Sequence, residues 1–271
     1  MSSYVCLRLE SLQKRFDEID LLLNYASKNE HTNDLYCTLC RSAQIFIVAH
    51  FEGAIKDIVR DVLDDFNNSE YEFKDSPEAI KRTFCNYFLE NEDGRSNEKK
   101  LKKLYEVFDS LPVKYGVDPF LYSNSENNNK NPSPHVVERI MEKFGVTFFL
   151  TRIYNSDLDV AFEDSKSDMI NLRDRLRQHL MSALDTYPYK IDLDLFNISS
   201  AKCKKETNSL WFDFLETIQN YRHKIAHGNT LENLDSHTNI AKTRIQVEIL
   251  IYAFIMILCK YAIPKNAVDG G

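Results

Sequence analysis

A chain of 271 residues is long enough for one large domain or for a core domain with an extended insertion. About 43% of its residues are apolar and only 7 are glycine, which excludes a disordered or collagen-like chain and favours a helix-rich globular one. The formal net charge of −7 argues against generic nucleic-acid binding, although it is compatible with a local basic site.

Two long amphipathic helices are predicted at the start of the chain. Apolar residues recur every three or four positions between residues 3 and 28, which is the spacing of one helical face. The same spacing continues from about Asp34 to Phe66, and Asn33 or Asp34 is expected to cap this second helix. Polar residues and Pro77 then break the pattern.

The middle of the chain is less regular. A short helix is predicted around residues 101–108, and residues 123–134 (SNSENNNKNPSP) are typical of an exposed loop. A helix follows from His135 to Phe144, and Gly145 is expected to end it in the left-handed conformation. Residues 67–165 therefore look like an insertion between two pairs of long helices within a single domain of residues 1–271.

The last third again has helical periodicity. Helices are predicted at residues 172–184, 210–227 and 240–262. The most apolar segment, residues 249–259, is too short to span a bilayer, so we expect a buried central helix and no membrane association. No segment alternates as a strand would, and the fold class is therefore predicted to be an all-α helical bundle.

The cysteines are scattered through apolar helical segments and are interpreted as reduced, buried thiols of a cytoplasmic protein. The first residues also carry charges where a secretory signal would be apolar. The pair Cys37 and Cys40 allows a zinc site, but no second pair of ligands stands at a suitable spacing, so core packing is favoured. No cofactor or metal is expected.

Two basic clusters are interpreted as solvated helix faces or loops, with nucleic-acid contact as the alternative. They are Arg95, Lys99, Lys100, Lys102 and Lys103, and Lys202, Lys204 and Lys205.

The segment RHKIAH at residues 222–227 carries the residues best suited to chemistry. Arg222 offers a planar cation that matches a phosphate, and His227 can take or give a proton. His223 lies four residues before His227, so both imidazoles share one helical face. Such a set suits metal-free RNA cleavage, in which the 2′-OH is the nucleophile, and the roles of base and acid stay open.

These residues resemble the R-x(4–6)-H motif of the HEPN superfamily, the higher eukaryotes and prokaryotes nucleotide-binding domains. Residues 49–56 (AHFEGAIK) are similar to the AHWEGFIK segment of a bacterial HEPN branch tied to defence and toxin loci, and residues 135–146 also resemble that branch. The likeness extends over roughly residues 35–262. It leaves the long insertion and the acidic charge as departures from the family pattern.

The resemblance implies an HEPN-like bundle that forms a homodimer with the active site at the interface. It implies a metal-independent endoribonuclease, leaving 2′,3′-cyclic phosphate and 5′-OH ends, with Arg222, His227 and His223 as catalytic residues. Glu52 is expected in a supporting role. The RNA substrate, tRNA included, would be cut by a toxin or antiviral effector, which allows an antitoxin or defence-system partner.

Other interpretations remain open. A non-catalytic HEPN module that binds RNA, nucleotide or a partner protein is the main alternative, and a motif that merely builds a dimer interface is another. A zinc site at His223 and His227 is disfavoured because Lys224 stands where a zincin has glutamate. A second arginine–histidine pair, Arg173 and His179, lacks the small residues and glycine after it and is interpreted as surface charge.

Overall fold

The computed structural model describes residues 2–89, 98–111, 116–123, 133–163, 165–199, 209–228 and 235–268. Within these ranges every regular element is a helix and none is a strand, which confirms the predicted all-α class. The long helices are α1 (Tyr4–Lys28), α2 (Asn33–Asn68), α8 (Lys166–Ala183), α9 (Leu210–Ala226) and α10 (His237–Tyr261).

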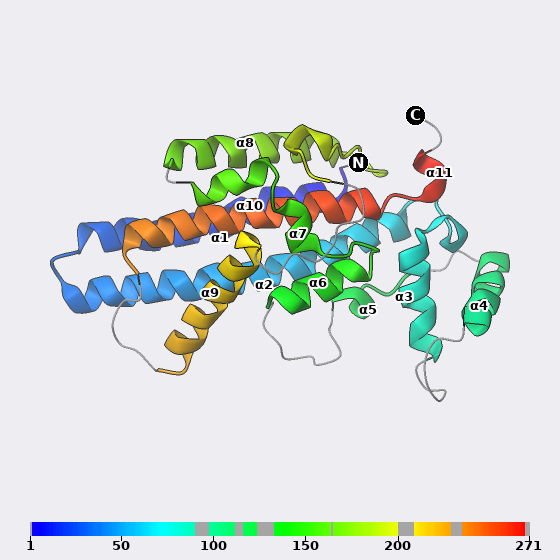
Figure 1. The fold of residues 1–271 in the computed structure, drawn as a ribbon, viewed down its shortest axis with the longest axis horizontal. Coiled ribbons are helices and arrows are strands. Elements are labelled where there is room, and N and C mark those ends of the chain that lie inside the picture. The colour runs from blue at the N-terminus through cyan, green and yellow to red at the C-terminus, as the bar shows by residue number, and fades with distance from the viewer. Residues whose placement is uncertain are drawn as a thin grey trace.

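The molecule is elongated, and α1, α2 and α10 run along its long axis (Figure 1). Helix α1 pairs with α2 as a hairpin, and α10 packs against both. Helix α8 lies along α10, whereas α9 lies across α2 and points away from the bundle (Figure 1). The end of α9 is therefore presented at the surface.

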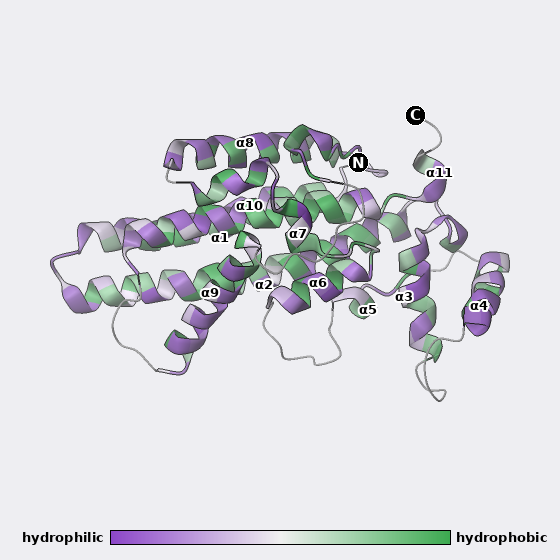
Figure 2. Ribbon diagram, viewed as in Figure 1, coloured by the Kyte–Doolittle hydropathy of each residue, from purple (hydrophilic) through white to green (hydrophobic). Residues whose placement is uncertain are grey.

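Helix α10 forms the centre of the core. Every residue from Arg244 to Cys259 is buried, and Figure 2 shows this apolar stretch passing through the middle of the molecule. A helix that is apolar on all sides needs partners on all sides, and here α1, α2 and α8 supply them. The predicted buried central helix is confirmed.

The region between the two helix pairs contains short helices. They are η1 (Phe73–Asp75), α3 (Glu78–Leu89), α4 (Glu98–Ser110), α5 (Phe120–Ser123), α6 (Pro134–Glu142), α7 (Phe149–Ile153) and η2 (Asp157–Phe162). Two more, η3 (Asp194–Phe196) and α11 (Lys265–Val268), follow α8 and α10. Most of the predicted loop at residues 123–134 lies outside the described residues.

Glycine ends α6 as predicted. Gly145 has φ +89°, and the N–H of Val146 donates to the carbonyl of Met141 at 3.0 Å, which closes the last turn. A side chain at this position would also meet Ala79, because its Cβ would lie 3.0 Å from the alanine methyl group. Glycine is thus required here by both conformation and packing.

The predicted cap of α2 is wrong. The helix starts at Asn33, its N-cap is Thr32, and no side chain caps it. The reason is the tight turn from α1, in which the Thr32 N–H donates to the carbonyl of Asn29 at 2.9 Å. This turn leaves Asn33 and Asp34 inside the helix, one and two positions after the N-cap.

A buried polar network joins α1, α8 and α10. Glu248 is 1% exposed, accepts a hydrogen bond from Arg244, and accepts another from the Tyr252 hydroxyl at 2.7 Å. Arg244 also donates to Asp20 on α1 at 2.8 Å. Arg173 on α8 lies 3.7 Å from Glu248, so its interpretation as surface charge is wrong: periodicity did not reveal the buried carboxylate that faces it.

Candidate active site at the end of helix α9

The motif residues occupy the last turn of α9 and its C-cap. The helix ends at Ala226, and the N–H of the C-cap residue His227 donates to the carbonyl of His223 at 3.1 Å. Gly228 follows with φ +67°, the left-handed conformation that glycine commonly adopts just after a helix. The C-terminal end of a helix carries partial negative charge, so cations are favoured there.

The two histidines lie together. The ring centroids of His223 and His227 are 4.3 Å apart, and the ring planes are inclined at 57°. Both residues are exposed. The predicted shared helical face is therefore present, and two groups that can carry a proton stand side by side at the surface.

Arg222 is half-buried and forms no hydrogen bond or ion pair with another described residue. Its guanidinium is thus available for an anionic ligand. No contact among the described residues joins it to either imidazole. Arg222 and His227 are five positions apart, which corresponds to about 140° around an ideal helix, although His227 is the C-cap residue that follows the last helical turn.

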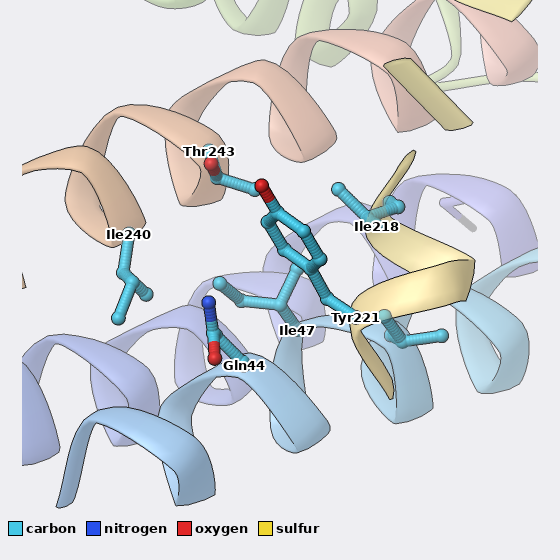
Figure 3. A pocket seen from close by; sticks show the side chains of 7 residues that line it. Gln44, Ile47, Ile218, Tyr221, Ile240 and Thr243 are labelled. Carbon is cyan, nitrogen blue, oxygen red and sulfur yellow. The ribbon is translucent and has the colours of Figure 1, made fainter. Parts of the chain in front are cut away.

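A tyrosine beside the motif anchors this turn. Tyr221, next to Arg222, points into the space between α9, α2 and α10, with its hydroxyl end beside Thr243 (Figure 3). A cavity of about 10 Å³ remains here, on the scale of one water molecule. It is lined by Gln44, Ile47, Val48, Ile218, Tyr221, Ile240 and Thr243.

The only sequence signal for this anchor was spacing. Ile218 and Tyr221 are three residues apart and face the bundle, and the motif begins immediately afterwards. Tyr221 therefore connects the position of the motif to the packing of α9 on α2.

Among the described residues, no hydrogen bond or ion pair joins Glu52 to the motif. It lies on α2 and forms an ion pair with Lys56 at 2.8 Å, with 23% of its side chain exposed. His50, two residues earlier, faces α1 instead, where its Nε2 lies 3.0 Å from Glu18. Burial lowers the pKa of His50, although the carboxylate of Glu18 opposes this effect.

Cys37 and Cys40, the pair considered for a zinc site, differ in how deeply they are buried. Cys40 is buried, whereas Cys37 is half-buried and donates to Asn33 at 3.5 Å. Within the ranges that the structure describes, no three His, Cys, Asp or Glu side chains are grouped closely enough to hold a metal ion.

A family model described as RiboL-PSP-HEPN matches residues 10–261. The chain belongs to this HEPN family. The match covers α1, α2, α9 and α10 together with the helices between them, so it includes both the bundle and the motif. HEPN families include ribonucleases and RNA-binding modules, and HEPN domains often dimerise.

No curated protein and no solved structure matches the chain. No helix among the described residues is long and apolar enough to cross a membrane.

Proposed function

We propose that this HEPN protein is a metal-independent endoribonuclease whose catalytic residues are Arg222, His223 and His227. The observation that carries the proposal is the guanidinium of Arg222, which pairs with no described residue, on the same helix end as two adjacent imidazoles. A cation for the phosphate and two groups for proton transfer are what cleavage of an RNA strand requires.

The reaction follows from these groups. One imidazole takes the proton of the ribose 2′-OH, and the oxygen attacks the adjacent phosphorus. The bond from phosphorus to the 5′-oxygen then breaks, and the other imidazole gives that oxygen a proton. Arg222 stabilises the charge that builds up on the phosphate. The products are a 2′,3′-cyclic phosphate and a 5′-OH, and DNA is not cut because it lacks the nucleophile.

The proposed active unit is a homodimer with the site at its interface. Arg222 and His227 diverge around the helix in one chain, and a second copy would bring a further set of cations to the same phosphate. Mixing Arg222→Ala and His227→Ala protomers tests this. Activity should return in the mixture if the arginine and histidine of one site come from different chains, and light scattering should report a dimer.

We further propose a biological role as a toxin or antiviral effector that acts in the cytoplasm on host or phage RNA, with tRNA among the candidates. An antitoxin or defence-system protein would then hold the activity in check. Glu52 retains a supporting role in this proposal, acting from α2. Expression of the wild type should arrest growth, and expression of Arg222→Ala or His227→Ala should not.

Cleavage of RNA in vitro, with mapping of the end groups, tests the chemistry directly. Wild-type protein should cut in the presence of EDTA, whereas Arg222→Ala and His227→Ala should not. Lys224→Ala is the matched control, since Lys224 is an exposed cation in the same turn. RNA binding without cleavage by the wild type would support the non-catalytic alternative, and cleavage that persists in both variants would refute the proposal.

A further inference from the structure

Helices α3 and α4 form a pair that exposes aromatic rings. Tyr87 and Phe88, at the end of α3, are 54% and 50% exposed. Large apolar side chains gathered at a surface commonly mark a binding site, since their exposure to water is unfavourable. This pair lies at one end of the long axis, and α4 is the outermost helix there (Figure 1).

The exposed rings are held in place by other rings. The centroid of Phe88 lies 5.2 Å from that of Phe84, 5.7 Å from that of Phe108, and 5.5 Å from that of Tyr87. Phe84 is buried, so it fixes Phe88 from below. Aromatic rings packed in this way form a preorganised surface with little conformational freedom left to lose on binding.

The outer face of α4 is positively charged although the whole chain has a net charge of −7. Lys102 and Lys103 are exposed and form no ion pair with a described residue. Two acidic side chains of α4 are already neutralised, Glu98 by Arg82 at 2.9 Å and Asp109 by Lys81 at 2.8 Å.

Glu106 is the remaining carboxylate of α4 and is also exposed. Lys102 and Lys103 outnumber it. The outer face of this helix therefore favours an anionic ligand.

We propose that Tyr87, Phe88, Lys102 and Lys103 bind a single-stranded segment of the RNA substrate. Every base has a face that stacks on an aromatic ring, and every nucleotide carries a phosphate for a lysine. This inference rests on the proposed ribonuclease function and narrows its substrate class. It also changes the interpretation of the α4 lysines, because the sequence did not reveal that α4 packs against α3, the helix that exposes the two rings.

The position of this surface sets a minimum size for the RNA. Helix α9 packs on α2 around Gln44, and α3 follows the end of α2 at Asn68. The 24 residues from Gln44 to Asn68 rise by ~36 Å along a helix. An RNA that touches both the motif and the α3–α4 pair must span a comparable distance, which a very short oligonucleotide does not.

Fluorescence anisotropy with a labelled, unstructured single-stranded RNA of about 30 nucleotides tests the proposal. All proteins carry Arg222→Ala so that the RNA stays intact. Tyr87→Ala combined with Phe88→Leu should weaken binding about ten-fold or more, while leucine keeps most of the packing around position 88. Lys102→Glu with Lys103→Glu should make the plot of log K against the logarithm of the salt concentration less steep. Its slope should fall in magnitude by about 1.4, which is about 0.7 for each lost phosphate contact.

Matched controls separate this surface from general effects. Lys14→Glu with Lys166→Glu reverses two exposed lysines on α1 and α8, and Leu21→Ala with Tyr25→Ala removes two side chains that are each 54% exposed on α1. Both controls should bind the RNA like the parent protein. Circular dichroism and thermal midpoints must show that every variant is folded.

Cleavage provides the second readout, in protein with Arg222 intact. The α3–α4 variants should cut a hexanucleotide at the wild-type rate and should raise KM for the long RNA. Unchanged binding and KM would overturn the inference while leaving the ribonuclease proposal standing, and the patch would then suit a protein partner. A wild type that neither binds nor cuts RNA would overturn both.

Discussion

His223 and His227 face each other across one turn of α9, with ring centroids 4.3 Å apart at the exposed end of the helix. Two imidazoles this close can serve one reaction as base and acid. Because the two rings lie against each other, replacing one of them also changes the surroundings of the other. The effect of a single substitution on activity therefore does not belong to one histidine alone. Their contributions have to be separated by experiments that read proton transfer and phosphate binding independently.

Removal of the side chain of Arg222 or of His227 should slow the chemical step. Arg222→Ala and His227→Ala should each lower kcat by about 10² to 10⁴, the range of one acid, base or charge-stabilising group. Arg222→Lys should recover only part of the activity, since lysine lacks the planar fork that binds a phosphate through two hydrogen bonds. Single-turnover cleavage of a defined RNA is the measurement.

His223 is tested by the shape of the pH profile. With one imidazole as base and the other as acid, a plot of kcat/KM against pH has a rising and a falling limb. His223→Gln should remove one of them. A variant whose rate and profile both match the wild type would show that His223 takes no part in the chemistry.

The sequence predicted the long helices well because their apolar spacing is regular and their ends carry recognisable residues. Gly145 is in the left-handed conformation expected of it. The start of α2 was predicted wrongly because it depends on how tightly α1 turns, and residue preferences for capping do not encode this.

The predicted site rested on local spacing and a family resemblance, so it named Arg222, His223 and His227 as candidates but said nothing of their surroundings. Tyr221 sits against residues of α2 that are distant in sequence, as Gln44 illustrates. Arg173 and Glu248 are likewise brought together only by the packing of α8 on α10. Such relationships depend on tertiary packing, which periodicity does not specify.

Tyr221 should matter to both stability and activity. Tyr221→Ala removes the ring between α9, α2 and α10 and should lower the free energy of unfolding by about 1–3 kcal/mol, below the range for a fully buried aromatic because the residue is half-buried. It should also lower kcat, since the turn bearing Arg222 loses its anchor. Tyr221→Phe keeps the ring and should behave like the wild type; equal losses in both variants would assign the effect to the hydroxyl instead.

Glu248 should be among the most sensitive positions of the core. Glu248→Ala leaves Arg244, which is 3% exposed, without its buried partner, and breaking a buried ion pair from one side costs about 3–5 kcal/mol. Urea denaturation measures this. Asp174→Ala is the control, because Asp174 pairs with Arg173 but its side chain is 58% exposed. A loss for Glu248→Ala as small as that control's would mean that the network contributes little.

His50 should make stability depend on pH in mildly acidic solution. Burial lowers its folded-state pKa below the ordinary value of 6.5, so the unfolded chain takes up the proton first as the pH falls. The contribution of His50 is therefore complete above pH 6.5 and declines as the pH falls toward the folded-state pKa. Urea midpoints of the wild type and His50→Gln should differ by a constant amount above this pH, and the wild type should lose stability relative to the variant below it. A difference that stays constant down to about pH 5, or that moves in favour of the wild type, would show that the imidazole is not held in its neutral form by burial.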